Sequence, residues 1–188
     1  MSASFAADWY VGGVIAYGYN WSSTTSKQYE IKNNSVTSNI SIASASGKLY
    51  VGGIVGHSGM HTKYTSNSYK GTITTSSANG FVGGMVGSTV LTATSTNSND
   101  TYYNYTFASN SVDATLSTAG YVGALVGGHY NSTTSAIKST PIFKYIFDAY
   151  KPNTLSAVTN VKEAVSSYRD DARFTVVIED LEGGVVVK

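Results

Sequence analysis

The sequence predicts a mainly β protein: a β-solenoid (β-helix) of about four glycine-motif repeats with a small C-terminal α+β cap or docking segment. Two recurring motifs lead to this prediction. One is an aromatic residue followed by Val-Gly, a small residue and two apolar residues; the other is Asn-Ser followed by an apolar residue. A repeat that cannot bury its own apolar strand has to bury it against a copy of itself. We therefore expect the repeats to stack into an elongated molecule.

The glycine motif begins at positions 10, 50, 81 and 121, so its copies are 40, 31 and 40 residues apart. This spacing is typical of structural repeats rather than of a catalytic fingerprint. Glycine permits positive φ and close approach of another backbone, so we expect the glycines to serve a sharp bend or tight packing. The structural glycines of the motif are Gly12, Gly13, Gly52, Gly53, Gly56, Gly83, Gly84, Gly87, Gly123 and Gly127.

The Asn-Ser motif begins at Asn34, Asn67 and Asn110, and each copy continues with alternating apolar and polar residues. This pattern predicts a turn that leads into a half-buried strand, because Asn tolerates left-handed backbone. We expect the Asn side chains of successive repeats to form a ladder. The gap from each aromatic to the next Asn is 24, 17 and 29 residues, so insertions accumulate after the glycine motif. Such insertions are frequently the binding face of a repeat array.

The glycine motifs resemble the GLUG repeat of bacterial surface proteins. Gly53-Ile54-Val55-Gly56 and Gly84-Met85-Val86-Gly87 match its core best, and Asn67-Ser68-Tyr69 fits its companion segment. Gly13-Val14-Ile15-Ala16 lacks the last glycine, and Ala124-Leu125-Val126-Gly127 lacks the first. The resemblance covers roughly residues 9 to 130 and implies a β-solenoid surface scaffold. The peptidase activity of some GLUG proteins lies in a separate domain, and the H-E-x-x-H motif is absent from this sequence.

The last fifty residues differ, so we expect two parts: repeats over residues 1–137 and a C-terminal segment over residues 138–188. Apolar residues from Leu155 to Tyr168 recur at helical spacing, with Asn153 as a candidate N-cap. Residues 173–178 and 185–187 have the composition of strands. A helix with two strands at the end of a solenoid is suited to cap it; alternatively, these strands pair with another subunit.

Composition argues against several classes of protein. Only 12% of residues are charged and the net charge is +1, which argues against nucleic acid as the main partner. The chain has no cysteine, and no apolar run reaches the roughly 18 residues of a membrane span. Its first residues lack the basic and apolar regions of a signal peptide. We expect a mature or excised segment carrying an added Met, although a chain that works without that secretion route fits as well.

Few residues offer chemistry, and we expect no cofactor, metal site or catalytic group. His57 and His61 are four apart but lie among glycines, so we place them, like His129, in surface loops. Acidic pairs at 170–171 and 179–182 fit solvated turns better than a glycosidase site. Aromatic residues in the insertions are candidates for ligand contact, because rigid rings bind sugars and proteins at low entropic cost. They are Tyr102, Tyr103, Tyr105 and Trp21, with a stacked ladder on the solenoid wall as the alternative.

These features favour a non-enzymatic, adhesin-like surface or fibre module that recognises a cell-surface glycan or protein or assembles with copies of itself. We expect it outside the cell, at the cell surface or on a phage particle. A filament subunit that polymerises through its C-terminal strands is one alternative. The other is a phage or surface polysaccharide-processing enzyme. Because only Asp8, Glu30, Asp100 and Asp113 are acidic before residue 140, the sequence argues against the enzyme.

Overall fold

The computed structural model of the chain describes residues 8–18, 28–43, 47–59, 61–91, 102–131, 142–156, 164–166 and 175–188. These residues are mainly β, as predicted, and contain one short helix, α1 (Leu181–Gly184). The first eight strands are β1 (Trp9–Gly12), β2 (Ile15–Tyr17), β3 (Tyr29–Lys32), β4 (Ser35–Ile42), β5 (Leu49–Gly52), β6 (Val55–Ser58), β7 (Thr62–Thr65) and β8 (Ser68–Thr75). The others are β9 (Gly80–Gly83), β10 (Val86–Leu91), β11 (Tyr102–Ala108), β12 (Ser111–Thr118), β13 (Tyr121–Gly123), β14 (His129–Asn131), β15 (Ile142–Phe147), β16 (Asn153–Ser156), β17 (Thr175–Glu179) and β18 (Val185–Val187).

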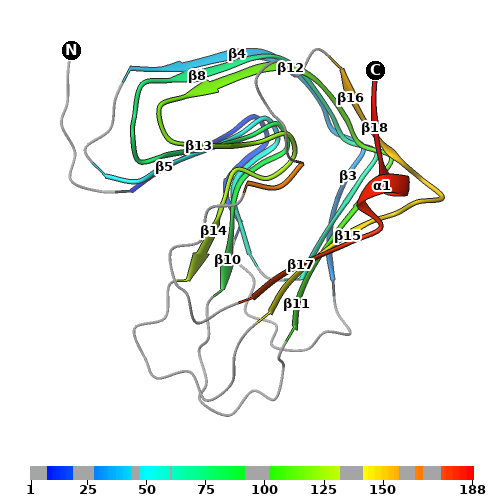
Figure 1. Cartoon of the computed structure of the whole chain (residues 1–188). Helices are drawn as coiled ribbons and strands as arrows, with labels where there is room; N and C mark the ends of the chain where they lie inside the picture. Colours follow the sequence, from blue (N-terminus) through cyan, green and yellow to red (C-terminus); the bar gives the residue numbers. More distant parts are fainter. Residues whose placement is uncertain are drawn as a thin grey trace.

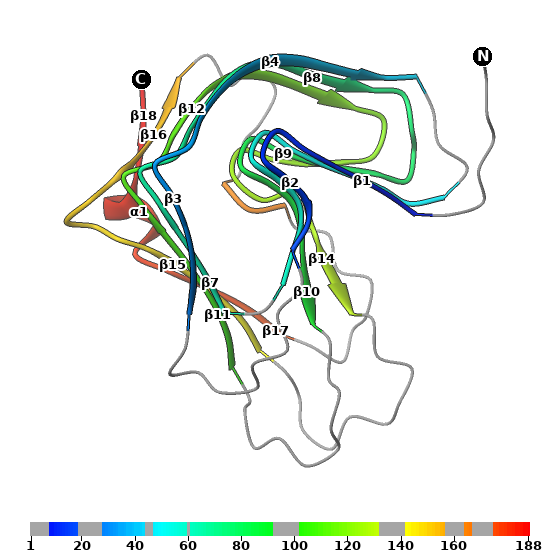
Figure 2. The ribbon, with the colours of Figure 1, turned by 180° about the vertical axis from the view of Figure 1, so that it is seen from behind.

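The strands form four parallel sheets, and consecutive strands belong to different sheets (Figures 1 and 2). Sheet A has the order β1-β5-β9-β13, and sheet B has the order β2-β6-β10-β14. Sheet C has the order β3-β7-β11-β15-β17, and sheet D has the order β4-β8-β12-β16-β18. Up to β16, each set of four consecutive strands visits sheets A, B, C and D in turn; we call such a set a circuit. Each strand therefore pairs with the equivalent strand of the neighbouring circuit.

The four glycine motifs lie in register in sheet A, which confirms the prediction that they stack. Tyr10 pairs with Tyr50, Tyr50 with Phe81, and Phe81 with Tyr121. The rings of these residues are stacked at centroid separations of 5.3, 5.1 and 5.3 Å. Such aromatic pairs contribute about 1 kcal/mol each beyond the burial of their surface. The spacing of the motif in the sequence thus reflects one circuit of the chain.

Close backbone approach explains the glycines of the motif. A Cβ atom at Gly53 would lie 2.3 Å from the carbonyl oxygen of Gly84 and 2.3 Å from Cγ of Tyr69. Positive φ does not explain them, because Gly71 is the only glycine with positive φ in the described part of the chain. Ala16 takes the place of the last motif glycine in the first circuit. A Cβ at the equivalent Gly56 would meet the preceding circuit, 2.6 Å from the carbonyl oxygen of Ala16.

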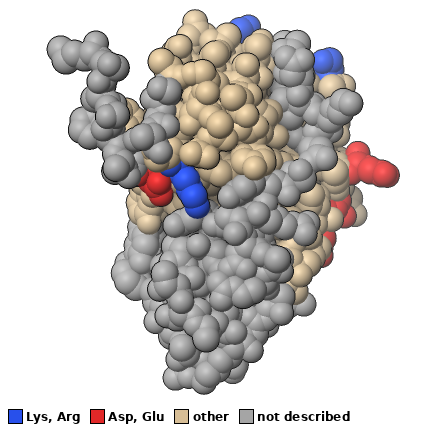
Figure 3. All heavy atoms as spheres, turned by 60° about the vertical axis from the view of Figure 1, so that its left-hand side comes forward, with Lys and Arg blue, Asp and Glu red and all other residues tan. Residues whose placement is uncertain are grey.

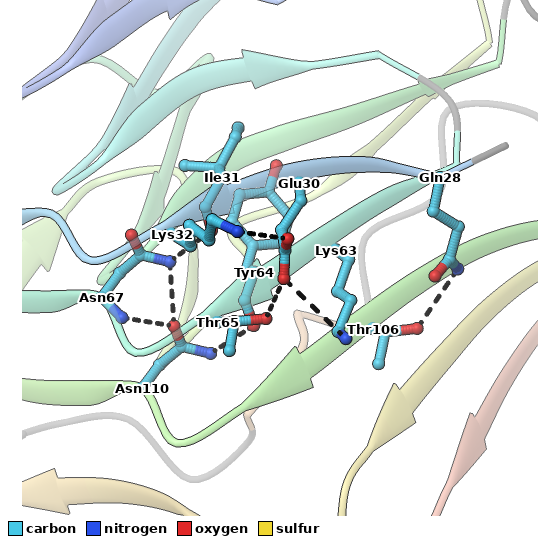
Figure 4. Close-up of polar contacts among 10 residues, drawn as sticks. All are labelled: Gln28, Glu30, Ile31, Lys32, Lys63, Tyr64, Thr65, Asn67, Thr106 and Asn110. Carbon is cyan, nitrogen blue, oxygen red and sulfur yellow. Dashed lines mark hydrogen bonds and ion pairs between the residues drawn. The ribbon is translucent and has the colours of Figure 1, made fainter.

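An asparagine ladder links the corners between sheets C and D, as the Asn-Ser motif predicts. The side-chain Nδ2 of each Asn donates to Oδ1 of the next one: 2.9 Å from Asn34 to Asn67, 3.1 Å from Asn67 to Asn110, and 2.8 Å from Asn110 to Asn153. Figure 4 shows the Asn67–Asn110 rung. Left-handed backbone occurs one residue earlier than expected, with φ of 58° at Asn33, 53° at Ser66 and 55° at Ser109.

The expected helix after Asn153 is wrong where the structure describes it. Residues 153–156 form strand β16, which pairs with β12 in sheet D, and Val165 forms a parallel bridge with Val126. Asn153 is fully buried as the fourth rung of the ladder rather than an N-cap, and its Nδ2 donates to the carbonyl oxygen of Gly184 at 2.9 Å. The strands expected near residues 173–178 and 185–187 are present as β17 and β18, which extend sheets C and D. Strand pairing in these two sheets therefore continues across residue 138.

Candidate functional site

The three histidines are buried, so the prediction of surface loops for them is wrong. His57, His61 and His129 expose 1%, 0% and 1% of their surface. His57 lies in β6 and His129 in β14, two strands of sheet B, whereas His61 immediately precedes β7 of sheet C. Among the residues that the structure describes, no group of three or more His, Cys, Asp or Glu side chains is placed to hold a metal ion.

His57 lies in an aromatic cluster between sheets A and B. Its ring lies 5.1 Å from each of the rings of Tyr10, Tyr17 and Tyr50 and stacks on Tyr17. Its Nδ1 is 2.5 Å from Oγ of Ser88 in the next circuit. Burial disfavours the charged imidazolium and lowers the pKa of His57 to about 3. A neutral ring of this kind can serve as a hydrogen-bond partner of Ser88 in the interior.

Hydroxyl groups join sheets B and C across the interior. The Tyr64 hydroxyl from sheet C donates to Ser58 Oγ of sheet B at 2.5 Å, and Ser58 Oγ donates to Thr62 Oγ1 at 3.2 Å. Thr89, which pairs with Ser58 in the next circuit, contacts the hydroxyl of Tyr145 from the fourth circuit. Burial raises the pKa of Tyr64, Tyr105 and Tyr145, so these phenols stay neutral.

His129 joins the contact between Thr89 and Tyr145. Its Nε2 is 3.2 Å from the carbonyl oxygen of Ser166, which can only accept, so Nε2 carries a proton. In the neutral ring Nδ1 then accepts from the Tyr145 hydroxyl at 2.5 Å, which leaves Thr89 to donate to the Tyr145 oxygen. Each of these groups has a partner, and the cluster is enclosed. Its evident role is to align the two sheets.

Of the four aromatic residues predicted to contact a ligand, two are in the interior. Tyr105 is fully buried and Tyr103 is 5% exposed, which corrects the expectation of a surface position for these rings. Tyr105 stacks on Tyr145 at 5.3 Å, in agreement with the ladder alternative. Tyr102 begins β11, but its side chain lies outside the described residues, as does Trp21. The exposed tyrosines of the described part are Tyr17, Tyr29, Tyr121 and Tyr150.

A cavity of about 250 Å³ lies between sheets B and C at the N-terminal end of the stack. Ile15, Ile31 and Val55 line it together with Tyr29, Ser58 and Thr62. Thr62 pairs with Tyr105, which pairs with Tyr145, so later circuits place a tyrosine where the second circuit has the small Thr62. The hydroxyls of Ser58 and Thr62 bond to each other and to the carbonyl oxygen of Gly59. The cavity therefore presents mainly apolar surface.

Within the four circuits that end at β16, the longest connections between strands join sheet B to sheet C. They span residues 18–28, 92–101 and 132–141, whereas β6 and β7 are joined by residues 59–61. The connections from sheet A to sheet B are two residues long in the first three circuits, and so are those from sheet C to sheet D. In Figure 1, β10 and β14 end, and β11 and β15 begin, at the same lower end of the molecule. Variation in repeat length is thus concentrated at one corner.

Sequence reasoning missed the buried polar residues and the fourth Asn. Ser58, Thr89 and His129 form one register column, yet their sequence contexts share no motif. Asn153 carried a usable signal: it is followed by Thr-Leu, a variant of Asn-Ser-apolar, and lies 43 residues after Asn110, the interval that separates Asn67 from Asn110. The adjacent Pro152 and the helical spacing of later residues favoured the wrong assignment.

Burial of His57 predicts a pH dependence of stability. The unfolded chain protonates this ring below about pH 6.5, whereas the folded protein keeps it neutral down to about pH 3. The unfolded state then binds more protons, so stability falls as the pH drops through this window, by about 1.4 kcal/mol per pH unit at most. The free energy of unfolding, measured by urea titration at several pH values between about 4 and 6.5, should change less steeply with pH for His57→Gln than for the unsubstituted protein. Equal slopes would show that His57 is not the buried titrating group.

No protein-family model matches the chain, and neither a curated protein nor a solved structure matches it. The resemblance to GLUG repeats therefore stays a prediction from the motif residues.

Proposed function

We propose that the four sheets form a β-solenoid and that the protein is a non-enzymatic surface or fibre module of the GLUG kind, outside the cell, at the cell surface or on a phage particle. The observation that carries the proposal is the register of the repeats: every sheet pairs equivalent strands of successive circuits. A molecule built this way is a rigid one-dimensional scaffold whose stability comes from contacts between neighbouring repeats. Such a scaffold tolerates insertions at one corner without disturbing its core.

The recognition surface in this proposal is the corner between sheets B and C. Insertions there leave the ladder at the C–D corner and the glycine turns at the A–B corner unchanged. The face drawn in Figure 3 shows few charged residues among those described, and charged pairs such as Lys70–Asp113 at 3.1 Å link adjacent strands. The partner expected at this corner is an uncharged glycan or a protein surface rather than a polyanion. Within the described residues, no helix has the length and apolar character needed to cross a membrane.

Shortening the insertions tests this proposal. We expect that replacing residues 92–101 by Gly59-Met60-His61, the natural connection between β6 and β7, retains the fold and removes binding to a glycan array or to cells. The matched control shortens the sheet D to sheet A connection at residues 43–48 to the length of residues 119–120, and it should retain binding. Full binding by the first variant would contradict recognition through this insertion. Hydrolysis of the bound polysaccharide would contradict a non-enzymatic role.

A further inference from the structure

Among the residues that the structure describes, the large exposed apolar side chains are concentrated at the two ends of the stack. At the N-terminal end, Val14, Tyr17 and Tyr29 are 47%, 43% and 55% exposed. At the C-terminal end the exposed set is Tyr121, Ile178, Leu181, Val186 and Val187. Among the described residues, only Tyr150, in the turn between β15 and β16, is a large exposed apolar residue elsewhere. In the described part of the chain the large exposed apolar residues thus lie mainly at the ends, which is the pattern of surfaces that associate.

We propose that these ends are one heterologous interface, in which the C-terminal end of one copy of the chain docks on the N-terminal end of a second copy. This interface adds self-assembly to the recognition module proposed above, through surfaces remote from the B–C corner. Strands β3 and β4 end sheets C and D on one side, and β17 and β18 end them on the other. Their edge hydrogen-bonding groups therefore face no further strand of their own sheet among the described residues. Docking of β17 against β3, and of β18 against β4, continues both sheets as parallel sheets.

The columns of side chains match across this contact. In sheet C one column runs Tyr29, Thr62, Tyr105, Tyr145 and Ile178, so it is apolar at both ends. In sheet D the column Val36, Tyr69, Val112, Leu155 and Val187 is apolar throughout. A second copy of the chain offers the sheet C column and the sheet D column at the same distance from each other. A protein with a different arrangement of sheets does not. Ile178 would then stack on Tyr29 of the next copy, at the mouth of the apolar cavity.

The asparagine ladder begins at the N-terminal end of the stack and ends at Asn153. Each rung Oδ1 accepts from the backbone N–H and Nδ2 of the Asn in the preceding circuit. Asn34 begins the ladder, so among the described residues no such donor precedes it. In a head-to-tail contact Val185 of the preceding copy would lie beside Asn34, and its backbone N–H donates to the carbonyl oxygen of Leu181, so the ladder itself does not cross the contact. The A–B corner contributes less to the proposed contact between copies. Ala16 carries a methyl group there, at the position where the later circuits have a glycine that allows close approach.

Two variants that each block one end test this inference. In a head-to-tail contact every interface needs one N-terminal and one C-terminal end. Tyr29→Lys alone and Ile178→Lys alone should therefore stay monomeric at 19.8 kDa in sedimentation velocity runs. An equimolar mixture should give a 1:1 dimer of twice that mass, because each variant retains the end that the other has lost. The unsubstituted protein and the Tyr150→Lys control should form longer oligomers as concentration rises.

Several results would overturn the inference: a monomeric unsubstituted protein across the concentration series, self-association of either single variant, or no dimer in the mixture. Val36→Lys and Val187→Lys, at the two ends of the sheet D column, replace the first pair if either variant has lost its β-type circular dichroism. The proposed recognition function is tested separately, because shortening residues 92–101 alters neither end. Glycan binding that survives this shortening would contradict the recognition function alone, whereas end variants that give no dimer when mixed would contradict the assembly alone.

Discussion

Replacing Gly53 by alanine will lower the free energy of unfolding by about 3 kcal/mol or more. The new Cβ atom would lie 2.3 Å from a backbone oxygen of the next circuit and 2.3 Å from the Tyr69 ring, and neither can withdraw without separating paired strands. Gly84→Ala should behave alike, since its Cβ would lie 2.4 Å from the carbonyl oxygen of Ala124. Urea unfolding followed by circular dichroism measures the loss.

Gly18→Ala is the matched control, because its Cβ would have no atom closer than 3.6 Å. It carries the same change in intrinsic propensity without the clash and should alter stability by no more than about 0.5 kcal/mol. Equal effects at Gly18 and Gly53 would mean that backbone flexibility, rather than close approach between circuits, explains the glycine motif.

Asn110→Leu will cost about 3 to 5 kcal/mol, the second large effect that we expect. The Asn110 side chain accepts from the backbone N–H of Asn67 at 3.0 Å and from its Nδ2 at 3.1 Å, and it donates to the carbonyl oxygen of Tyr64 at 3.0 Å. Leucine of similar size leaves these buried groups without partners, and each such group costs about 1 to 3 kcal/mol.

Asn34→Leu provides the comparison within the same ladder. Asn34 is half-buried at the first rung, so water can replace the partners that it loses, and the cost should be about 1 kcal/mol. Both variants are measured by the same urea titrations. A loss at position 34 as large as that at position 110 would contradict a ladder whose interior rungs are enclosed.

The repeating part of the fold was predictable because stacking imposes a local rule on the sequence. A glycine is needed wherever a neighbouring circuit leaves no room for Cβ. An Asn is needed wherever the backbone groups of the C–D corner require hydrogen-bond partners, so both residues recur as motifs. Even the departures have a cause: Ala16 stands in the first circuit, where no described strand of the sheet precedes it.

The rest was not predictable because it depends on which strands face each other across the interior. His57 and His129 look like loop residues in sequence. Only the contacts of His57 with Ser88 of the next circuit and of His129 with Tyr145 of sheet C make their burial acceptable. Tyr103 and Tyr105 follow an insertion, which suggested exposure, yet β11 turns both rings inward. The apolar ends of the stack likewise emerge only once the first and last circuits are known.

A distance between spin labels at the two ends of one register column tests the stacked-circuit account most directly. Glu30 and Glu179, both accessible on sheet C, are separated by four strand steps through Lys63, Thr106 and Ile146. With strands about 4.8 Å apart, their backbones should lie about 19 Å apart, and those of Lys63 and Glu179 about 14 Å apart.

The chain contains no cysteine, so labels attach only at introduced cysteines. Double electron–electron resonance should give two narrow distributions differing by about 5 Å. Broad distributions, or a longer distance for the Lys63 pair, would contradict the stack.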